Sequence, residues 1–350
     1  MIMAGGFGSH FWPLSKSNNP KQFIDVLGTG ESLLQATFHR FEKICLRENI
    51  IIVTGEDYAE KVRQQIPNLL PYQVLLEPTR RNTAPCIAYA AAIINDLNPN
   101  ANIIVTPSDH AVFSENLFVD NMVNAIDLVE RHDWIVIMGV RPTNPNTKYG
   151  YIQFDEKLAL PEVGNLHKVV TFTEKPPIEM ARQFLASGEF FWNAGIFVWR
   201  LPVLMAAFRL HLPQIADAFF KISRSTPISD IDAVYSGCQT ISIDFGIMEK
   251  ADNVYVMESA FGWSDVETWD SLYSTARRDE NNNAVVSGHV FSYGVSNCVV
   301  HVPEHKTVVL QGLDGYIVAG DNDTILVCRR DQEECVFKYA SDVELSNLTK

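Results

Sequence analysis

The residues nearest the N-terminus that could do chemistry form a glycine-rich loop, Gly5-Gly6-Phe7-Gly8-Ser9-His10. It follows the short apolar segment 1–4, which we interpret as the end of a strand. Glycines at this place let backbone N–H groups approach a phosphate closely, although a simple tight turn fits the same residues. Lys16 and Lys21 lie downstream and add positive charge to a chain whose formal net charge is −14. No Gly-Lys-Ser/Thr follows, so we predict a phosphate-binding loop that is not a P-loop.

Two aspartates are candidate metal ligands. Asp109 comes directly after a predicted strand at 103–106, and ligands of open α/β sheets bind at the carboxyl ends of the strands. A carboxylate there suits Mg²⁺, which takes few protein ligands and keeps several waters. The alternative for Asp109 is a helix N-cap or a turn. Asp265 precedes a helix that we expect to begin near Val266, and a helix N-cap is again the alternative.

The elements that must position these residues alternate along the first 280 residues. Continuous β-branched runs separated by helical segments predict a doubly wound α/β fold with helices on both faces of the sheet. The polar break at 281–283 is followed by short apolar runs that Gly, Asn and Asp separate, which predicts an all-β region. We therefore expect two domains, 1–280 and 281–350. The expected strands are 50–54, 74–76, 103–105, 134–138, 149–154, 169–173, 197–199 and 253–257, and the expected helices are 56–66, 82–97, 115–131, 177–187 and 265–278.

Composition excludes several classes of protein. The chain has 350 residues, of which 47% are hydrophobic and 20% are charged, as in an ordinary globular protein. Its acidic balance disfavours binding to nucleic acid or an anionic membrane through bulk electrostatics. No apolar run reaches the roughly 20 residues that span a bilayer. The six cysteines show no CxxC spacing, so we expect reduced thiols and a cytoplasmic location.

A resemblance covers essentially the whole chain. The N-terminal segment resembles the signature of the sugar-1-phosphate nucleotidyltransferases, because the glycine loop is followed by Trp-Pro-Leu-Ser and Pro-Lys-Gln-Phe. Within that family it most closely resembles the mannose-1-phosphate guanylyltransferases. Several matching blocks in the right order are far more specific than any one block. In chain order they are Gly5-Gly6, Trp12-Pro13-Leu14-Ser15, Pro20-Lys21-Gln22-Phe23, Glu77-Pro78, Arg81-Asn82-Thr83-Ala84-Pro85, Pro107-Ser108-Asp109-His110, Tyr149-Gly150-Tyr151, Thr173-Glu174-Lys175-Pro176, Trp192-Asn193-Ala194-Gly195, Ser242-Ile243-Asp244 and Trp263-Ser264-Asp265.

The resemblance implies a fold and an activity. The fold is a Rossmann-like, doubly wound mixed sheet of the GT-A type, with a small C-terminal domain similar to a left-handed β-helix that can mediate a homodimer. The activity is synthesis of GDP-mannose and pyrophosphate from GTP and α-D-mannose 1-phosphate. The cofactor is Mg²⁺, held by Asp109 and Asp265. Lys16, Lys21 and His10 are the implied catalytic residues at the phosphates.

The nucleotide is implied to lie on the glycine loop, with Gly5, Gly6, Gly8 and Ser9 against its phosphates. The loop that contains Asn82 and Thr83, together with Glu77, is implied to face the guanine base. Asn82 or Thr83 could instead cap the helix at 82–97.

The sugar phosphate is implied to bind Gly150, Glu174, Lys175 and Asn193. A carboxylate accepts hydrogen bonds from sugar hydroxyls and an ammonium group binds the phosphate. From the residues alone, a solvated charge pair is the more common role for Glu174 and Lys175. A turn is the alternative for Asn193.

One residue departs from the family pattern. His10 stands where relatives usually carry arginine, and a neutral histidine cannot bind two phosphate oxygens at once. We expect a loss of about 3 kcal/mol in stabilisation of the departing pyrophosphate. Two alternatives therefore remain: a sibling enzyme with another base or sugar, and a weakly active paralogue that binds nucleotide sugar. We treat Asp244-Phe245-Gly246 as a chance match to a kinase tripeptide.

Overall fold

The computed structural model describes residues 1–6, 11–155 and 165–348. It divides into two compact units, each built from several chain segments. Unit 1 contains residues 1–5, 38–107 and 112–263, and unit 2 contains 6–37, 108–111 and 264–350. The chain passes between the units within the short strands β5 (Ala111–Val112) and β11 (Trp263–Ser264). The domain boundary near residue 280 stays a prediction, since these units are not continuous stretches of sequence.

Unit 1 is built on a mixed sheet, as expected. Within the described residues the sheet has nine strands in the order β3-β2-β1-β4-β9-β6-β10-β8-β7. Strands β1 to β4 are parallel to one another, whereas β9 is antiparallel to both β4 and β6. The strands are β1 (Ile2–Met3), β2 (Ile52–Gly55), β3 (Val74–Glu77), β4 (Asn102–Pro107), β6 (Ile135–Val140), β7 (Gly150–Asp155), β8 (Leu166–Glu174), β9 (Phe190–Arg200) and β10 (Val254–Glu258).

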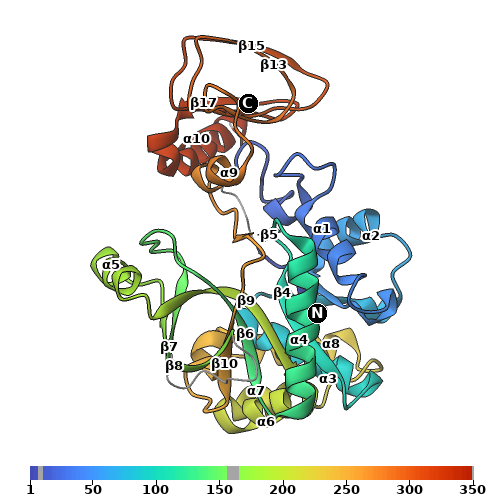
Figure 1. Ribbon diagram of the computed structural model, residues 1–350. Coiled ribbons are helices and arrows are strands. Elements are labelled where there is room, and N and C mark those ends of the chain that lie inside the picture. The colour runs from blue at the N-terminus through green and yellow to red at the C-terminus, as the bar shows by residue number, and fades with distance from the viewer. Residues whose placement is uncertain (7–10, 156–164, 349–350) are drawn as a thin grey trace. The chain divides into compact units, whose positions relative to one another are not determined.

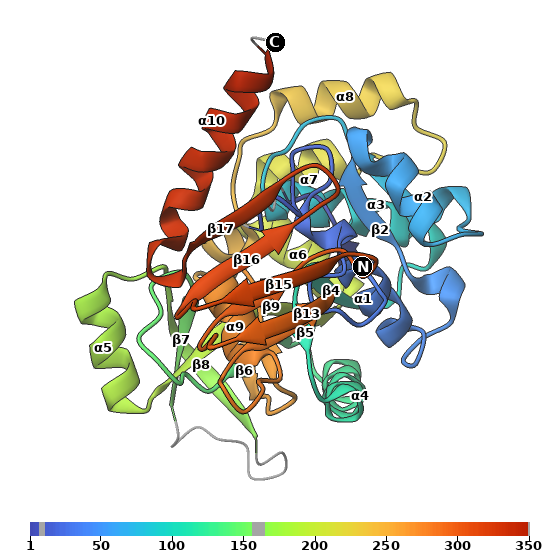
Figure 2. The same ribbon diagram turned by 90° about the horizontal axis from the view of Figure 1, so that it is seen from above.

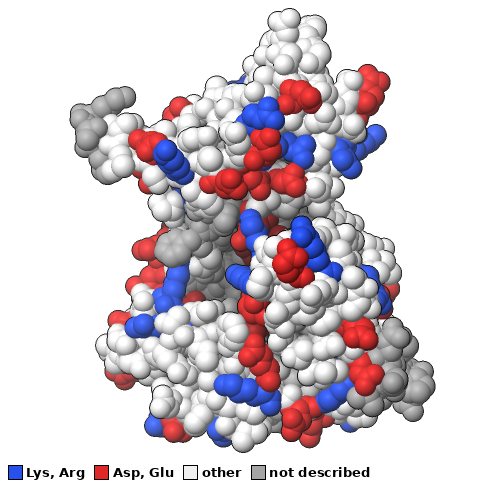
Figure 3. Space-filling view, turned by 90° about the vertical axis from the view of Figure 1, so that its left-hand side faces the viewer, with Lys and Arg blue, Asp and Glu red and all other residues white. Residues whose placement is uncertain are grey.

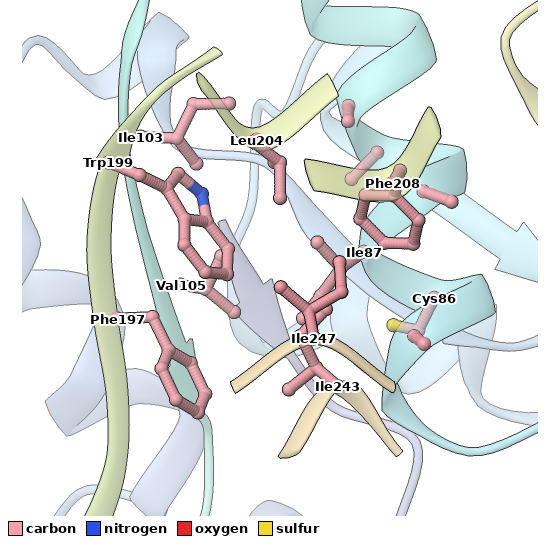
Figure 4. Close-up of a cluster of buried hydrophobic side chains, with 14 of the residues drawn as sticks. Cys86, Ile87, Ile103, Val105, Phe197, Trp199, Leu204, Phe208, Ile243 and Ile247 are labelled. Atoms are coloured by element: carbon pink, nitrogen blue, oxygen red, sulfur yellow. The ribbon is translucent and has the colours of Figure 1, made fainter. Parts of the chain in front are cut away.

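Helices pack on this sheet through apolar side chains. In Figure 4, Phe197 and Trp199 of β9 lie with Ile103 and Val105 of β4 in one buried cluster that Ile87 of α3 also joins. The α4 helix packs against β4, β6 and β9 (Figure 1). The helices that contribute residues to unit 1 are α1 (Leu33–Phe41), α2 (Ala59–Gln65), α3 (Thr83–Leu97), α4 (Glu115–Arg131), α5 (Ile178–Ser187), α6 (Leu201–His211), α7 (Pro213–Phe219) and α8 (Ile228–Gly237).

Unit 2 is rich in strands. Strands β12, β14 and β16 form a parallel sheet with β17 antiparallel at its edge, and β13 pairs with β15 in a second parallel sheet (Figure 2). Successive strands of the chain alternate between these two parallel sheets, as expected of a β-helix. The left-handed sense of the coil stays a prediction. The strands are β12 (Ala284–Ser287), β13 (His289–Tyr293), β14 (Val299–His301), β15 (Thr307–Gln311), β16 (Tyr316–Gly320) and β17 (Ile325–Arg329).

Two expectations for unit 2 were wrong in detail. The described chain ends in a long helix, α10 (Val336–Leu348), so the C-terminal region is not all-β. The helix expected near Val266 begins later, as α9 (Trp269–Thr275). The reason is local, because Val266 has a φ of +43°, a left-handed conformation that no helix accommodates.

The N-terminal signature segment belongs to unit 2 and packs on its strands. Phe11, Trp12 and Val26 share a buried cluster with Val299 and Ile317. The ring nitrogen Nε2 of His301 lies 3.0 Å from the Asp25 carbonyl oxygen. The segment that carries Lys16 and Lys21 is therefore held in place by the C-terminal strands.

Charged side chains are interspersed on the face drawn in Figure 3. Blue and red groups alternate there, and among the described residues no continuous basic stripe crosses that face. No helix in the described part of the chain has the length and apolar character needed to cross a membrane.

Candidate active site

Lys21 is the centre of a cluster in unit 2. It begins a short 3-10 helix (Lys21–Phe23) and is only 4% exposed. Its ammonium nitrogen Nζ lies 3.1 Å from Asp109 Oδ2 and donates a hydrogen bond of 2.7 Å to the Asp265 carbonyl oxygen. A buried ammonium group is stable only when it is paired in this way. Three residues predicted from the sequence, far apart in the chain, thus meet at one point.

Asp109 presents an ionised carboxylate. It follows β4, and its side chain is 29% exposed. Burial acts to raise the pKa of Asp109, but the positive charges of Lys21 and His110 and local hydrogen bonds outweigh it, so the pKa lies below its usual value. His110 Nε2 lies 3.8 Å from Asp109 Oδ1. No helix begins at Asp109, so the helix N-cap alternative is wrong for this residue.

Asp265 lies in a tight turn. Its Oδ1 accepts a hydrogen bond of 3.3 Å from the Glu267 N–H, and the Ser264 hydroxyl oxygen accepts one of 3.1 Å from the Val266 N–H. Thr268 caps α9, because its hydroxyl oxygen accepts the Ser271 N–H at 3.0 Å. The N-cap alternative is therefore wrong for Asp265 too. A β-branched residue at φ +43° stores strain, which is common where a turn aims a functional group.

The donor set of this cluster suits Mg²⁺. The partly exposed Asp109 carboxylate offers hard oxygen ligands, whereas Asp265 reaches Lys21 through its backbone carbonyl. Mg²⁺ takes one or two carboxylates and leaves its other positions to water and phosphate. In the described ranges, no group of three or more His, Cys, Asp and Glu side chains encloses a metal position.

Lys16 lies elsewhere in unit 2. Its Nζ donates to Asp321 Oδ2, in the turn between β16 and β17. That carboxylate also accepts the N–H groups of Asp323 and Thr324 at 2.9 and 2.7 Å. Burial acts to raise the pKa of Asp321, but these bonds lower it below its usual value. The structure does not bring Lys16 to Lys21, and its role at the triphosphate stays a prediction.

Part of the glycine loop can be described. Gly6 has open space where a Cβ would stand, and its carbonyl oxygen accepts a hydrogen bond of 3.0 Å from Gln22 Nε2. A Cβ on Gly5 would lie 3.4 Å from Glu77 Oε2. Gly8, Ser9 and His10 lie outside the described residues.

Glu77 is a buried carboxyl group in unit 1. It ends β3, is 6% exposed, and its Oε1 accepts a hydrogen bond of 3.2 Å from the Tyr235 hydroxyl. Burial raises the pKa of Glu77 to about 7, while hydrogen bonds from Tyr235 and Cys86 and the charge of Arg80 limit the rise. A carboxyl group that titrates near neutrality can accept a hydrogen bond when ionised and donate one when protonated.

Asn82 and Thr83 form the entrance to α3. Asn82 has a φ of +70°, and its Oδ1 accepts the Thr83 N–H at 2.8 Å. Asn82 therefore caps the helix, as the structural alternative predicted. The Thr83 hydroxyl oxygen accepts the Ile243 N–H at 2.8 Å. Contact of these residues with a nucleotide stays a prediction.

The predicted sugar-phosphate residues come together in unit 1. Gly150 of β7 pairs with Glu174 of β8, and a Cβ on Gly150 would lie 2.4 Å from Glu174 Oε2 and 3.4 Å from Asn193 Cβ. A side chain at Gly150 would therefore displace the Glu174 carboxylate from this position. Lys175 follows with a φ of +48° and donates its N–H to the Tyr149 carbonyl oxygen at 3.2 Å.

Asp244 joins this group, although the sequence analysis set it aside. Asn193 Nδ2 donates a hydrogen bond of 2.9 Å to Asp244 Oδ1. Burial, and next the charge of Asp244, raise the pKa of Glu174 to about 7. The signal that could have found Asp244 was its place in a matching block, Ser242-Ile243-Asp244, rather than the kinase-like tripeptide.

Comparison with known proteins finds relatives that match most of this chain. A model of the family described as nucleotidyl transferase matches residues 1–282. A mannose-1-phosphate guanylyltransferase of Escherichia coli is 31% identical over 99% of this chain and 75% of its own length. One from Salmonella montevideo is 33% identical over 99% of this chain and 74% of its own length. A crystal structure described as mannose-1-phosphate geranyltransferase, from Thermus thermophilus, has a TM-score of 0.87 and 30% identity, and covers 98% of both chains.

Proposed function

The chain belongs to the nucleotidyl transferase family of enzymes, and we propose that it makes GDP-mannose and pyrophosphate from GTP and α-D-mannose 1-phosphate. The names of relatives that match over its full length support this choice of substrates. The observation that carries the proposal is the contact of Lys21 with both Asp109 and Asp265. A cation, a metal-binding carboxylate pair and a glycine loop suit the transfer of a nucleotidyl group.

The residues of unit 2 act on the phosphates in this proposal. Lys21 neutralises charge at the reacting α-phosphate, and Lys16 and His10 stabilise the triphosphate on the glycine loop. Asp109 and Asp265 hold Mg²⁺. The bound ion supplies charge neutralisation and orientation of the phosphate oxygens.

The residues of unit 1 give specificity in this proposal. Glu77 accepts hydrogen bonds from the guanine edge, beside the loop of Asn82 and Thr83. The sugar phosphate binds the group formed by Gly150, Glu174, Lys175 and Asn193. Guanine presents two neighbouring N–H donors, which an ionised carboxylate can accept together.

The transfer needs no nucleophile from the protein. The sugar phosphate is already an anion, and its oxygen attacks the α-phosphorus of GTP in line while the bond to pyrophosphate breaks. Electrons of the breaking bond leave with pyrophosphate, whose charge the cations offset. Catalysis is then positioning and charge stabilisation.

Two further properties belong to this proposal. The six cysteines are free in the structure, which supports a reducing, cytoplasmic location. Phe291, Tyr293 and Val309 of the β13–β15 sheet are more than half exposed, which supports a homodimer formed through unit 2.

Pyrophosphate release from the purified protein tests the function. We expect turnover that needs GTP, mannose 1-phosphate and Mg²⁺ together, that is lost in Asp109→Ala, and that rises in His10→Arg. Turnover that occurs only when another nucleotide replaces GTP, or another sugar phosphate replaces mannose 1-phosphate, would identify a sibling enzyme. If wild type binds GDP-mannose without turnover, and His10→Arg restores turnover, the protein is a weakly active paralogue.

A further inference from the structure

The amide of Asn193 is fixed at both ends. Its Nδ2 donates to Asp244 Oδ1 at 2.9 Å, and its Oδ1 accepts the Gly195 N–H at 2.9 Å. Gly195 has a φ of +68°, a conformation that favours glycine. A carboxamide has two N–H protons and two oxygen lone pairs. One proton and one lone pair of Asn193 therefore remain for a ligand, in an orientation that Asp244 helps to set.

Packing fixes the segment that carries Asp244. Residues Asp244–Met248 form one turn of π-helix, an uncommon conformation that recurs at functional sites. A Cβ on Gly246 would lie 2.7 Å from Leu212 Cδ1, so the buried Leu212 side chain would have to shift for any larger residue. The position of the Asp244 carboxylate thus follows from the core beneath it.

Asp244 also acts on Glu174. Both side chains are half-buried, and the charge of Asp244 disfavours ionisation of Glu174. For Glu174, burial and Asp244 raise the pKa to about 7, with Lys175 lowering it and Glu249 raising it. For Asp244, burial and the charge of Glu249 raise the pKa, while the hydrogen bond from Asn193 and the charge of Lys175 lower it.

We propose that Asp244 is a positioning residue of the sugar-phosphate subsite, where it orients the Asn193 amide and acts on Glu174 for binding of sugar hydroxyls. This inference rests on the proposed function. An oriented amide and a single ionised carboxylate recognise neighbouring hydroxyls, one as donor and one as acceptor. Orientation before binding reduces the entropy lost when the sugar binds.

Two substitutions separate the roles of Asp244. Asp244→Asn keeps an acceptor for Asn193 Nδ2 and removes the charge, whereas Asp244→Leu removes both while keeping the same number and branching of side-chain heavy atoms. We expect Asp244→Leu to raise KM for mannose 1-phosphate on the order of tenfold, with KM for GTP unchanged, since a bond to a charged acceptor is lost. Asp244→Asn should stay within about threefold of wild type at pH 8.

The pH profile gives a readout that a structural role would not move. In wild type, KM for mannose 1-phosphate should fall as pH rises through about 7, because ionised Glu174 accepts from hydroxyls. Asp244→Asn removes a repelling charge, lowers the pKa of Glu174 and should move the midpoint to lower pH. The substrate phosphate titrates in the same way in both proteins, so the difference between their profiles reports the protein.

Glu60→Gln is the control, since Glu60 is an exposed carboxylate of α2, and both its KM at pH 8 and its pH midpoint should match wild type. Thermal unfolding of each variant reports its folding. An unchanged KM in folded Asp244→Leu, or an unmoved midpoint in Asp244→Asn, overturns this inference alone when wild type turns over. Absence of wild-type turnover with GTP and mannose 1-phosphate overturns it together with the proposed function.

Discussion

The Lys21 ammonium group lies 3.1 Å from the Asp109 carboxylate, although Lys21 begins a short 3-10 helix and Asp109 follows a strand far along the chain. Lys21 is almost completely buried, and the Asp109 side chain is partly open to solvent. The pair therefore has a protected cation behind an accessible anion. This arrangement can receive a metal ion and a phosphate without first burying a new charge.

Removal of the Lys21 charge should mainly affect the rate of the reaction. We expect Lys21→Met to lower kcat by about 10²- to 10³-fold, because a preorganised cation at developing charge is lost. Steady-state pyrophosphate release measures this. Lys43→Met is the control, since Lys43 forms an exposed ion pair with Glu115, and its kcat should match wild type. An equal loss in both variants would contradict a specific role for Lys21.

Stability should fall as pH rises through the titration of Glu77. Its pKa is raised from 4.5 to about 7 by burial, so the folded state binds a proton there that the unfolded state has lost. The free energy of unfolding therefore decreases between about pH 4.5 and 7, by about 3 kcal/mol from this group. Glu77→Gln removes that contribution. The free energy of unfolding of this variant should therefore increase relative to that of wild type, by about 3 kcal/mol, as the pH rises from 5 to 8.

Urea unfolding at pH 5 and pH 8 measures the difference. Glu56→Gln, at an exposed carboxylate, is the control and should change the free energy of unfolding by less than about 0.5 kcal/mol. A difference between Glu77→Gln and wild type that is independent of pH would show that Glu77 is ionised throughout.

The residues alone were sufficient to predict most strands of the sheet and the place of Asp109 just after β4. Apolar runs give strands directly, and Asp109 follows its strand closely, so topology brings it to the binding edge. The resemblance added Asp265 and the group around Asn193. All of these residues could be found from the sequence because each lies beside a recognisable strand or within a matched motif.

The features that the sequence did not reveal depend on contacts between distant segments. Asp244 gains its role from Asn193, 51 residues away, and no local pattern indicates that bond. The late start of α9 depends on a left-handed Val266, a conformation that β-branched residues almost never adopt. Lys16 pairs with Asp321 across most of the chain, which spacing alone could not indicate.

Asp265 and Thr268 should have separable effects. Thr268→Ala removes the cap of α9 and should cost about 1 kcal/mol of stability with kcat unchanged. Asp265→Asn keeps the turn and the Lys21 contact, which uses the backbone carbonyl, and should abolish turnover with little change in stability. Urea unfolding and pyrophosphate release on both variants measure this. Equal losses of stability would indicate that Asp265 is structural.

Two neighbouring glycines test how the C-terminal strands support the signature segment. Gly28 has a φ of +67°, and a Cβ there would lie 2.2 Å from the Val286 carbonyl oxygen of β12. Gly30 has a φ of +86°, and its Cβ would meet open space. Gly30→Ala should therefore cost only the backbone strain, about 1–2 kcal/mol. Gly28→Ala adds a collision with backbone and should cost about 2 kcal/mol more.

Since the same segment carries Lys21, Gly28→Ala should also lower kcat, whereas Gly30→Ala should not. Equal stabilities for the two variants in urea unfolding would show that the strands do not hold this loop.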